Sequence, residues 1–278
     1  MNARISGMLF AVSSSVSNQV GAGMGALVFP AIGPLGVVAV RQFVTAIVFV
    51  CLARPKWRQL TRRDWAYAGA LGVALGAMSA GTYGAINQIG LGLAVTIEFL
   101  GPLGVAIAML RRRIDLFAIV AALVGVVLLV QPGPTSNYLG VAYAGIGALG
   151  WASYILLNRT LGARLNGLEG PAVASVVSAV LWIPVAVFWF TAHPPPLWAI
   201  GVAMVCAIFS SLLPFASDLA ALRRVSAGIF GILTSLNPVW AALIGWLVLG
   251  QLLEPLEWTG LALVVGSNAL VMATSSRR

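Results

Sequence analysis

Charged side chains are scarce in this chain, of whose 278 residues only 8% are Asp, Glu, Lys or Arg. About a quarter of a soluble domain is charged, so this chain has too few polar side chains to cover a soluble globule. The single histidine, His193, lies in a Pro-rich turn without companion ligands, and no metal site is expected. The two cysteines, Cys51 and Cys206, lie in apolar segments, where we interpret them as small core residues.

Hydrophobic residues make up 60% of the chain and its mean hydropathy is +0.99, which indicates an integral membrane protein. A helix needs about 20 apolar residues to cross the hydrocarbon core, so the chain is long enough for about ten crossings. Charged and turn-forming residues divide the apolar sequence into predicted spans at 5–26, 34–53, 64–84, 89–110, 115–131, 138–158, 170–190, 197–218, 226–248 and 257–274. The Gly-rich sequence GAGMG (21–25) follows no strand, so no dinucleotide or other cofactor is expected.

Basic residues collect in alternate connections between the predicted spans. All of them except Arg41 fall on one side of the ten-span arrangement, and the connections on the other side contain none. They are Arg4, Arg54, Lys56, Arg58, Arg62, Arg63, Arg111–Arg113, Arg159, Arg164, Arg223, Arg224, Arg277 and Arg278. By the positive-inside rule, both termini are cytoplasmic. The net charge of +9 therefore reflects membrane topology, and no nucleic-acid partner is expected.

The two halves of the chain repeat each other. Gly7, Ser14, Asn18, Gly21 and Gly25 recur at an offset of 133 as Gly140, Gly147, Trp151, Tyr154 and Asn158. Both sets have the spacing of one face of a helix. We therefore divide the chain into repeats at 1–133 and 134–278. Each repeat holds five spans, an odd number, so the second is inserted upside down relative to the first, as in secondary transporters.

Glu98 is a carboxylate in the middle of the apolar segment Ile89–Leu110, with no basic residue within twelve positions. A charge at bilayer depth costs several kcal/mol, so Glu98 faces either a partner charge or a wet cavity. A functional site and a structural ion pair between helices both fit this position. Arg41 lies at a similar depth, and we predict that it pairs with Glu98 directly or through one water.

Four segments resemble the EamA family of the drug/metabolite transporter superfamily. They are FPAIGPLGVVAVR (29–41), AVTIEFLGPLGVA (94–106), LGWASYILLNR (149–159) and GILTSLNPVWAALIGWLVLGQ (231–251). Within the family, the chain is most similar to bacterial threonine/homoserine exporters and more distantly to aromatic amino-acid exporters. This resemblance implies ten spans in two EamA-type repeats, and it places the typical arginine and glutamate on Arg41 and Glu98. Asn237 replaces a glutamate that such exporters often carry before the ninth-span proline, which leaves the energy source open.

An amino-acid substrate needs an anchor for its carboxylate, an anchor for its ammonium group, and an apolar or aromatic wall. Arg41 and Glu98 supply the two anchors. The other predicted substrate-binding residues are Asn18, Tyr83, Trp151, Tyr154, Trp182 and Asn237. For Trp151, central on the repeated stripe, ordinary packing is the alternative to a place in the cavity wall.

Three prolines, Pro102, Pro214 and Pro238, lie inside predicted spans, where each removes a backbone hydrogen bond and permits a kink. Pro102 and Pro238 are equivalent in the two repeats, so we predict hinges for alternating access, with a static kink as the alternative. Asp218 and the arginine pair that follows it form a cap or a gate at the cytoplasmic end of the eighth span.

Together these features predict an all-α, multi-pass, monomeric protein of the bacterial inner membrane with ten transmembrane helices. We expect a secondary transporter that exports small metabolites, above all amino acids, and whose partners are its substrate and the lipid bilayer. An intramembrane enzyme is one alternative, but no paired carboxylates or histidines lie at bilayer depth and no catalytic residue is assigned. A passive channel is the other alternative, although the inverted repeat and the aromatic stripe favour a gated, substrate-sized cavity.

Overall fold

The computed structural model describes residues 3–109, 113–131, 133, 136–165 and 167–275. Within these ranges the regular elements are helices and no β-strand occurs, which confirms the all-α class. The α-helices are α1 (Ala3–Leu27), α2 (Phe29–Ala53), α3 (Arg62–Ile89), α4 (Leu91–Glu98), α5 (Leu100–Met109), α6 (Arg113–Val130), α7 (Tyr138–Gly162), α8 (Glu169–Ala192), α9 (Leu197–Ala207), α10 (Leu213–Leu222), α11 (Ala227–Thr234), α12 (Asn237–Leu249) and α13 (Pro255–Ser275). A 3₁₀ turn, η1 (Trp57–Gln59), and a π-helical turn, η2 (Ile208–Leu212), complete the elements.

Helices cover each of the ten predicted segments, but the fourth, eighth and ninth segments are interrupted near their prolines. Each interruption lies at, or directly after, the residue four positions before the proline. The pairs are Glu98 with Pro102, Ser210 with Pro214, and Thr234 with Pro238. A proline has no N–H to bond that residue's carbonyl, and its ring clashes with it. The helices are therefore interrupted at the three prolines, whereas the hinge role stays a prediction.

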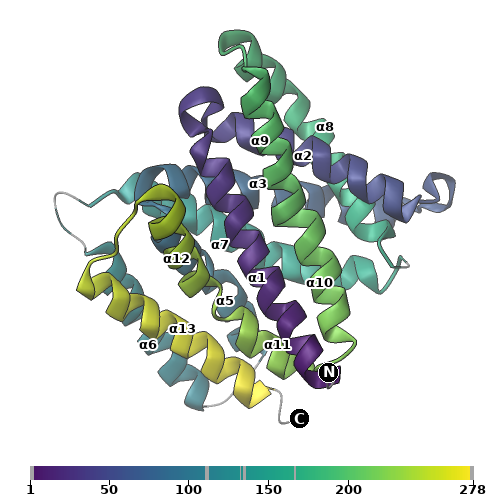
Figure 1. Cartoon of the computed structure of the whole chain (residues 1–278). Coiled ribbons are helices and arrows are strands. Elements are labelled where there is room, and N and C mark those ends of the chain that lie inside the picture. The colour runs from purple at the N-terminus through teal and green to yellow at the C-terminus, as the bar shows by residue number, and fades with distance from the viewer. Residues whose placement is uncertain (1–2, 110–112, 132, 134–135, 166, 276–278) are drawn as a thin grey trace.

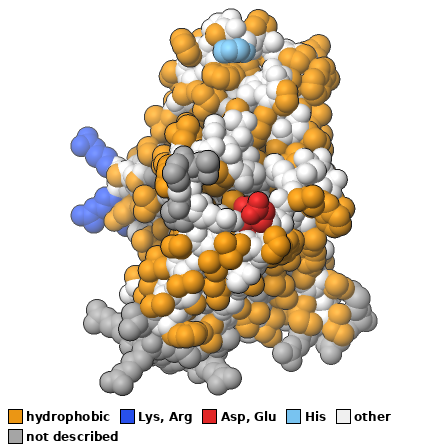
Figure 2. Space-filling model, turned by 90° about the vertical axis from the view of Figure 1, so that its left-hand side faces the viewer, with side chains coloured by type: hydrophobic (Ala, Val, Ile, Leu, Met, Phe, Trp, Pro, Cys, Tyr) orange, Lys and Arg blue, Asp and Glu red, His pale blue; other side chains and the backbone are white. Residues whose placement is uncertain are grey.

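Six helices in the described part are long and apolar enough to cross a membrane. They are Phe29–Ala53, Arg62–Ile89, Tyr138–Gly162, Glu169–Ala192, Leu197–Leu222 and Ile229–Leu249. Large apolar side chains cover the outer faces, such as Phe117 on α6 and Phe188 on α8, which are 68% and 75% exposed. The face in Figure 2 is largely hydrophobic, with acidic side chains near its centre. Such a surface suits lipid and would promote aggregation in water.

Helices far apart in sequence lie side by side. α3 packs along α7, α2 along α8, and α1 against α10 and α12, while α6 and α13 pair at the edge of the molecule (Figure 1). α6 and α13 correspond to the fifth and tenth predicted spans. Of the predicted cytoplasmic arginines, Arg111, Arg112, Arg277 and Arg278 lie outside the described residues.

Small residues bring α3 and α7 together. A Cβ atom added at Gly150 would lie 2.8 Å from Met78 Cα, and one added at Gly81 would meet the Gly147 backbone. Glycine permits this approach because it has no side chain, as is common between helices in membranes. The close contact fixes the position of the α7 face that packs against α3 and α4.

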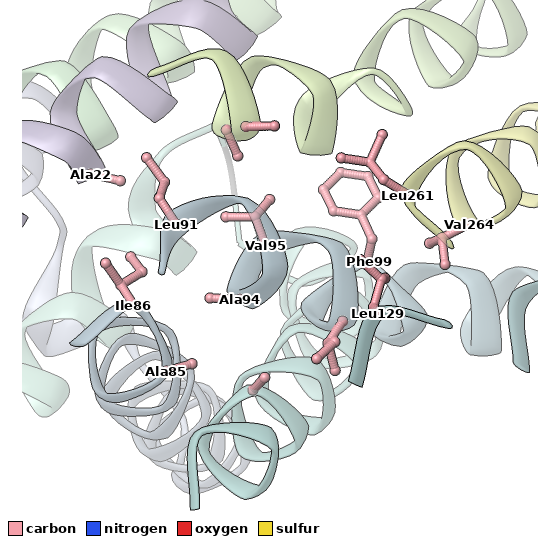
Figure 3. Packing of buried hydrophobic residues seen from close by; sticks show 14 residues of the cluster. Ala22, Ala85, Ile86, Leu91, Ala94, Val95, Phe99, Leu129, Leu261 and Val264 are labelled. Atoms are coloured by element: carbon pink, nitrogen blue, oxygen red, sulfur yellow. The ribbon is translucent and has the colours of Figure 1, made fainter. Parts of the chain in front are cut away.

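The short helix α4 lies in the middle of a hydrophobic cluster. Figure 3 shows Leu91, Val95 and Phe99 from this segment among side chains of α3, α6 and α13, including Ile86, Leu129 and Leu261. Most residues of α4, including Glu98, are buried. Packing therefore holds the broken helix end and the carboxyl group that it carries in a fixed place.

An ion pair fixes the start of α3. Asp64 Oδ1 accepts a hydrogen bond from Arg164 Nε at 2.6 Å, and Asp64 also forms a capping box with Thr61. The bond joins α3 to the connection between α7 and α8. The sequence placed Arg164 among the cytoplasmic basic residues but did not identify its partner.

Candidate functional site

The Glu98 carboxyl group is enclosed by three helices. The residue ends α4 and is 4% exposed, and its Oε1 lies 2.6 Å from Thr82 Oγ1 on α3. On α7, a Cβ added at Gly147 would lie 3.2 Å from the same oxygen. The glycine recognised in the sequence stripe therefore makes room for the carboxyl group.

Arg41 on α2 does not form an ion pair with Glu98 in the described part of the chain, so the direct form of the predicted pair is wrong. Its guanidinium carbon instead lies 5.5 Å from the centroid of the Tyr83 ring, in a cation–π contact. Consecutive residues of α3, Thr82 and Tyr83, thus contact the two predicted anchors, and the water-mediated pairing stays a prediction.

Tyr83 is fixed between α1, α2, α3 and α9. It is 1% exposed, its hydroxyl lies 3.2 Å from Cys206 Sγ, and its ring meets Phe29 edge-on at 6.1 Å. A Cβ added at Gly25 would lie 2.7 Å from the ring, so this glycine provides the space that Tyr83 fills. Burial makes Tyr83 a rigid support for the Arg41 guanidinium.

Hydroxyl groups satisfy the irregular backbone before Pro214. Ser17 donates to the Phe209 carbonyl at 2.7 Å, and Ser14 donates to the Pro214 carbonyl at 3.2 Å. Carbonyl groups in a π-helical turn need such partners because the regular bonding pattern is interrupted. Farther along α10, Asp218 Oδ1 is buried and has no hydrogen-bond partner among the described residues.

Asn237 begins α12 and faces α1. It is 8% exposed, and its Oδ1 accepts a hydrogen bond from Gln19 Nε2 at 3.2 Å. Asn18, the residue predicted from the stripe, is half-buried next to Gln19. The sequence therefore identified the polar region of α1 but not the residue that contacts Asn237.

The three predicted wall aromatics lie in different parts of the core. Trp151 is half-buried, and its ring meets the Phe99 ring edge-on with 4.7 Å between the centroids. Phe99 directly follows Glu98 in the chain. Tyr154 packs on a cluster between α3, α7 and α8. Trp182 is 9% exposed and lies in the cluster that contains Tyr83. The structure thus places Trp182 with Tyr83 and Trp151 near Glu98, while their roles toward a substrate stay predictions.

A cavity of about 380 Å³ opens near the ends of α3, α6 and α7. Apolar residues and five polar ones line it, and none of the eight predicted substrate-binding residues is among them. The polar lining residues are Gln131, Ser136, Asn137, Glu254 and Glu257. Glu257 accepts a hydrogen bond from the Glu254 N–H and Glu254 contacts Gln131, so both acids take part in local structure.

Thr82 and Gln19 are the two site residues that the sequence did not indicate. Threonine and glutamine are common in membrane helices without a functional role, and neither has a charge that would mark it at bilayer depth. The one indication in the sequence was that each is next to a predicted site residue: Thr82 precedes Tyr83, and Gln19 follows Asn18. Only the packing of α3 on α4 and of α1 on α12 shows which group each one contacts.

Known transporters resemble this chain in sequence. Residues 138–273 match the EamA-like transporter family. The threonine/homoserine exporter RhtA of Escherichia coli strain K12 is 32% identical over 260 residues, which cover 91% of this chain and 86% of the exporter. The exporter of the same name from Salmonella typhimurium strain SL1344 is 30% identical over 269 residues, with 94% and 88% covered.

Two further matches are more distant in sequence. The uncharacterized transporter YetK of Bacillus subtilis strain 168 is 25% identical over 170 residues, 57% of this chain and 52% of YetK. A crystal structure with 18% sequence identity superposes with a TM-score of 0.64 and covers 99% of both chains. On the extent and identity of the RhtA matches, this chain belongs to the EamA family of the drug/metabolite transporter superfamily.

Proposed function

We propose that this chain is a secondary transporter that exports amino acids by alternating access. The observation that carries the proposal is the buried Glu98 at the broken end of α4, whose carboxyl group contacts the Thr82 hydroxyl. An ionisable group at bilayer depth is costly and marks a functional site by default. The names of the RhtA relatives support amino acids as the substrate class.

The protein is a multi-pass protein of the inner membrane. We propose ten crossings, in which α4–α5, α9–α10 and α11–α12 each form one interrupted span. The start of α1 and the end of α13 lie on the same side of the molecule (Figure 1), as an even number of crossings requires. The basic connections identified in the sequence assign that side to the cytoplasm.

Helix contacts support two inverted repeats, the first in 1–133 and the second in 134–278. α2 packs on α8, α6 on α13, and α4 on α12, and each pair joins equivalent spans of the two halves. The contact of α3 with α7 likewise has its counterpart in the contact of α10 with α1. Equivalent contacts of this kind are expected around a pseudo-two-fold axis in the membrane plane.

The proposed substrate site lies between the two interrupted spans that meet through α4 and α12. Glu98 lies at the first interruption and Asn237 at the second. Discontinuous helices near the bilayer midplane form the substrate sites of many secondary transporters. In the proposed complex Glu98 binds the substrate ammonium group and Arg41 binds its carboxylate, with an aromatic wall around them. Asn18, Tyr83, Trp151, Tyr154 and Trp182 complete the proposed site.

The relatives are named as transporters, which does not favour an intramembrane enzyme. An intramembrane enzyme and a passive channel stay the alternatives. Transport of a panel of radiolabelled amino acids by the purified chain in proteoliposomes separates these functions. A transporter exchanges external label for internal unlabelled amino acid, and its rate saturates with substrate concentration. A rate that rises linearly with concentration supports a channel, and no amino-acid movement under any condition contradicts the proposal.

A further inference from the structure

The connection between α2 and α3 concentrates positive charge. Five of the ten residues from 54 to 63 are basic, and each of these five residues is exposed. In Figure 1 the connection lies at the right-hand edge of the molecule, beyond the end of α2. The α2–α3 basic patch, as we name this set, consists of Arg54, Lys56, Arg58, Arg62 and Arg63.

Within the described ranges, the basic patch has no acidic partner. The nearest acid in sequence is Asp64, whose carboxylate accepts hydrogen bonds from the Thr61 hydroxyl and N–H, at 2.6 and 2.9 Å. Asp64 forms its ion pair with Arg164 and not with a residue of the patch. Arg224, another cytoplasmic arginine, donates to a backbone carbonyl at 2.7 Å and lies 5.1 Å from the centre of the Phe10 ring. The charges of the patch are therefore left for a partner outside the chain.

Local hydrogen bonds give the connection a regular shape. Arg54 ends α2 in the left-handed conformation, with φ 45°, and its N–H donates to the Val50 carbonyl at 2.9 Å. The Gln59 N–H donates to the Lys56 carbonyl at 2.9 Å in η1, and Thr61 caps the start of α3. The connection is thus a structured turn that keeps the five charges close together.

Two tryptophans indicate the depth of the patch in the membrane. The rings of Trp57 and Trp65 stack with 6.2 Å between their centroids and 24° between their planes. The two residues are 39% and 42% exposed. Exposed tryptophans at the ends of membrane helices lie at the level of the lipid headgroups. Trp57 lies between Lys56 and Arg58 in the chain, so these two side chains reach the same level.

The last turns of α2 before the patch expose apolar side chains. Ile47 and Leu52 are 63% and 56% exposed. In a membrane such side chains contact lipid acyl chains, and the basic residues follow them toward the cytoplasm. One phospholipid can therefore place its chains against α2 and its headgroup against the patch.

We propose that the α2–α3 basic patch binds the headgroup of an anionic phospholipid in the cytoplasmic leaflet. The proposal goes beyond transport and needs only the proposed orientation of the chain. Guanidinium groups fit phosphate oxygens through paired hydrogen bonds, and clusters of about four to eight basic residues beside a membrane helix attract anionic lipids. The headgroup of a zwitterionic lipid carries its own ammonium group, which opposes this attraction. An acidic protein partner would match the charges but would leave the tryptophan pair without a role.

Competition between two lipids tests the proposal. The purified full chain in neutral detergent receives pyrene-labelled phosphatidylglycerol, and energy transfer from tryptophan reports its displacement by unlabelled phosphatidylglycerol or phosphatidylcholine with the same acyl chains. We expect phosphatidylglycerol to bind at least about tenfold more tightly, and this preference to decrease as salt is added. Equal affinities would overturn the proposal. Displacement by the same concentration of soluble glycerol phosphate would indicate a site for free phosphate groups and would also overturn it.

Paired substitutions test the position of the site. Lys56→Gln with Arg58→Gln is expected to weaken phosphatidylglycerol binding by at least about tenfold, because each basic side chain near an anionic surface strengthens binding about fivefold. Lys56→Arg with Arg58→Lys keeps both charges and is expected to stay within about threefold of wild type.

Arg277→Gln with Arg278→Gln removes the same charge outside the described residues and is the control for net charge. An equal loss in both glutamine pairs, or no loss in the first pair, would overturn the site. Lipid binding is measured without substrate, so a failure of the proposed transport function would leave this result unchanged.

Discussion

Gln19 on α1 donates a hydrogen bond to Asn237 on α12, with 3.2 Å between Nε2 and Oδ1. The two residues are 2% and 8% exposed, so the bond is made inside the protein. It joins the first proposed repeat to the second at the interruption between α11 and α12. It also involves Asn237, one of the predicted substrate-binding residues.

Removing one partner of this bond is expected to destabilise the protein. Asn237→Leu leaves the Gln19 amide buried without its partner, which costs about 1–3 kcal/mol of unfolding free energy. The double variant with Gln19→Leu replaces both polar groups and is expected to recover most of this loss. Unfolding midpoints in detergent measure both effects, with Thr160→Ala on the exposed face of α7 as the control. Equal midpoints for the single and double variants would contradict the pairing.

The close packing of α3 on α7 predicts a difference between two glycines of the same helix. A methyl group at Gly150 would lie 2.8 Å from Met78, whereas one at Gly145 would meet no atom within 4 Å. Gly150→Ala is therefore expected to lose about 1–3 kcal/mol through overpacking. Gly145→Ala is expected to be neutral or stabilising, because alanine favours a helix. Thermal unfolding temperatures of both variants measure this difference. Equal changes in unfolding temperature would contradict the close contact at Gly150.

Trp151 is predicted to set substrate size. Its ring contacts Phe99 next to Glu98, so Trp151→Ala enlarges the space beside the proposed ammonium site. We expect relative exchange rates to shift toward larger amino acids by about tenfold, as pocket changes of this size allow. Trp198→Ala, at a position that is 60% exposed, is the control. An unaltered substrate profile at normal expression would show that Trp151 only packs the core.

The prolines at the interrupted spans are predicted to permit movement. Pro102→Ala and Pro238→Ala restore a backbone donor and allow the helices to straighten. If the kinks act as hinges, exchange slows by about tenfold while substrate affinity stays close to wild type. The maximal exchange rate and the substrate dissociation constant, measured for each variant, distinguish slower movement from weaker binding. Normal exchange in both variants would leave the prolines as static kinks.

Much of the fold could be predicted from the sequence because it depends on strong local signals. Apolar runs bounded by turn residues located the helices, and prolines located their interruptions at Glu98 and Thr234. The interruption at η2 was predicted only as a kink, because the π-helical form depends on hydroxyl groups from α1 that lie far away in sequence.

The site was predicted less completely because its contacts are between helices. Glu98 could be recognised from its cost at bilayer depth, but its partner could not. The sequence favoured Arg41 on charge and depth, whereas the packing of α3 on α4 gives the contact to Thr82 instead. The Arg41 guanidinium lies over Tyr83 because cation–π contacts satisfy an arginine without bringing a second charge out of water.

Amino-acid exchange by Glu98→Gln tests the central claim most directly. The variant keeps the size of the side chain but removes the negative charge proposed to bind the substrate ammonium group. Glu254→Gln, at an exposed position directly before α13, is the matched control. Initial rates of labelled threonine exchange in proteoliposomes, with equal amounts of folded protein, give the comparison. The account predicts that Glu98→Gln loses at least about tenfold in rate while Glu254→Gln stays within about twofold of wild type. Equal rates in Glu98→Gln and the wild type would contradict it.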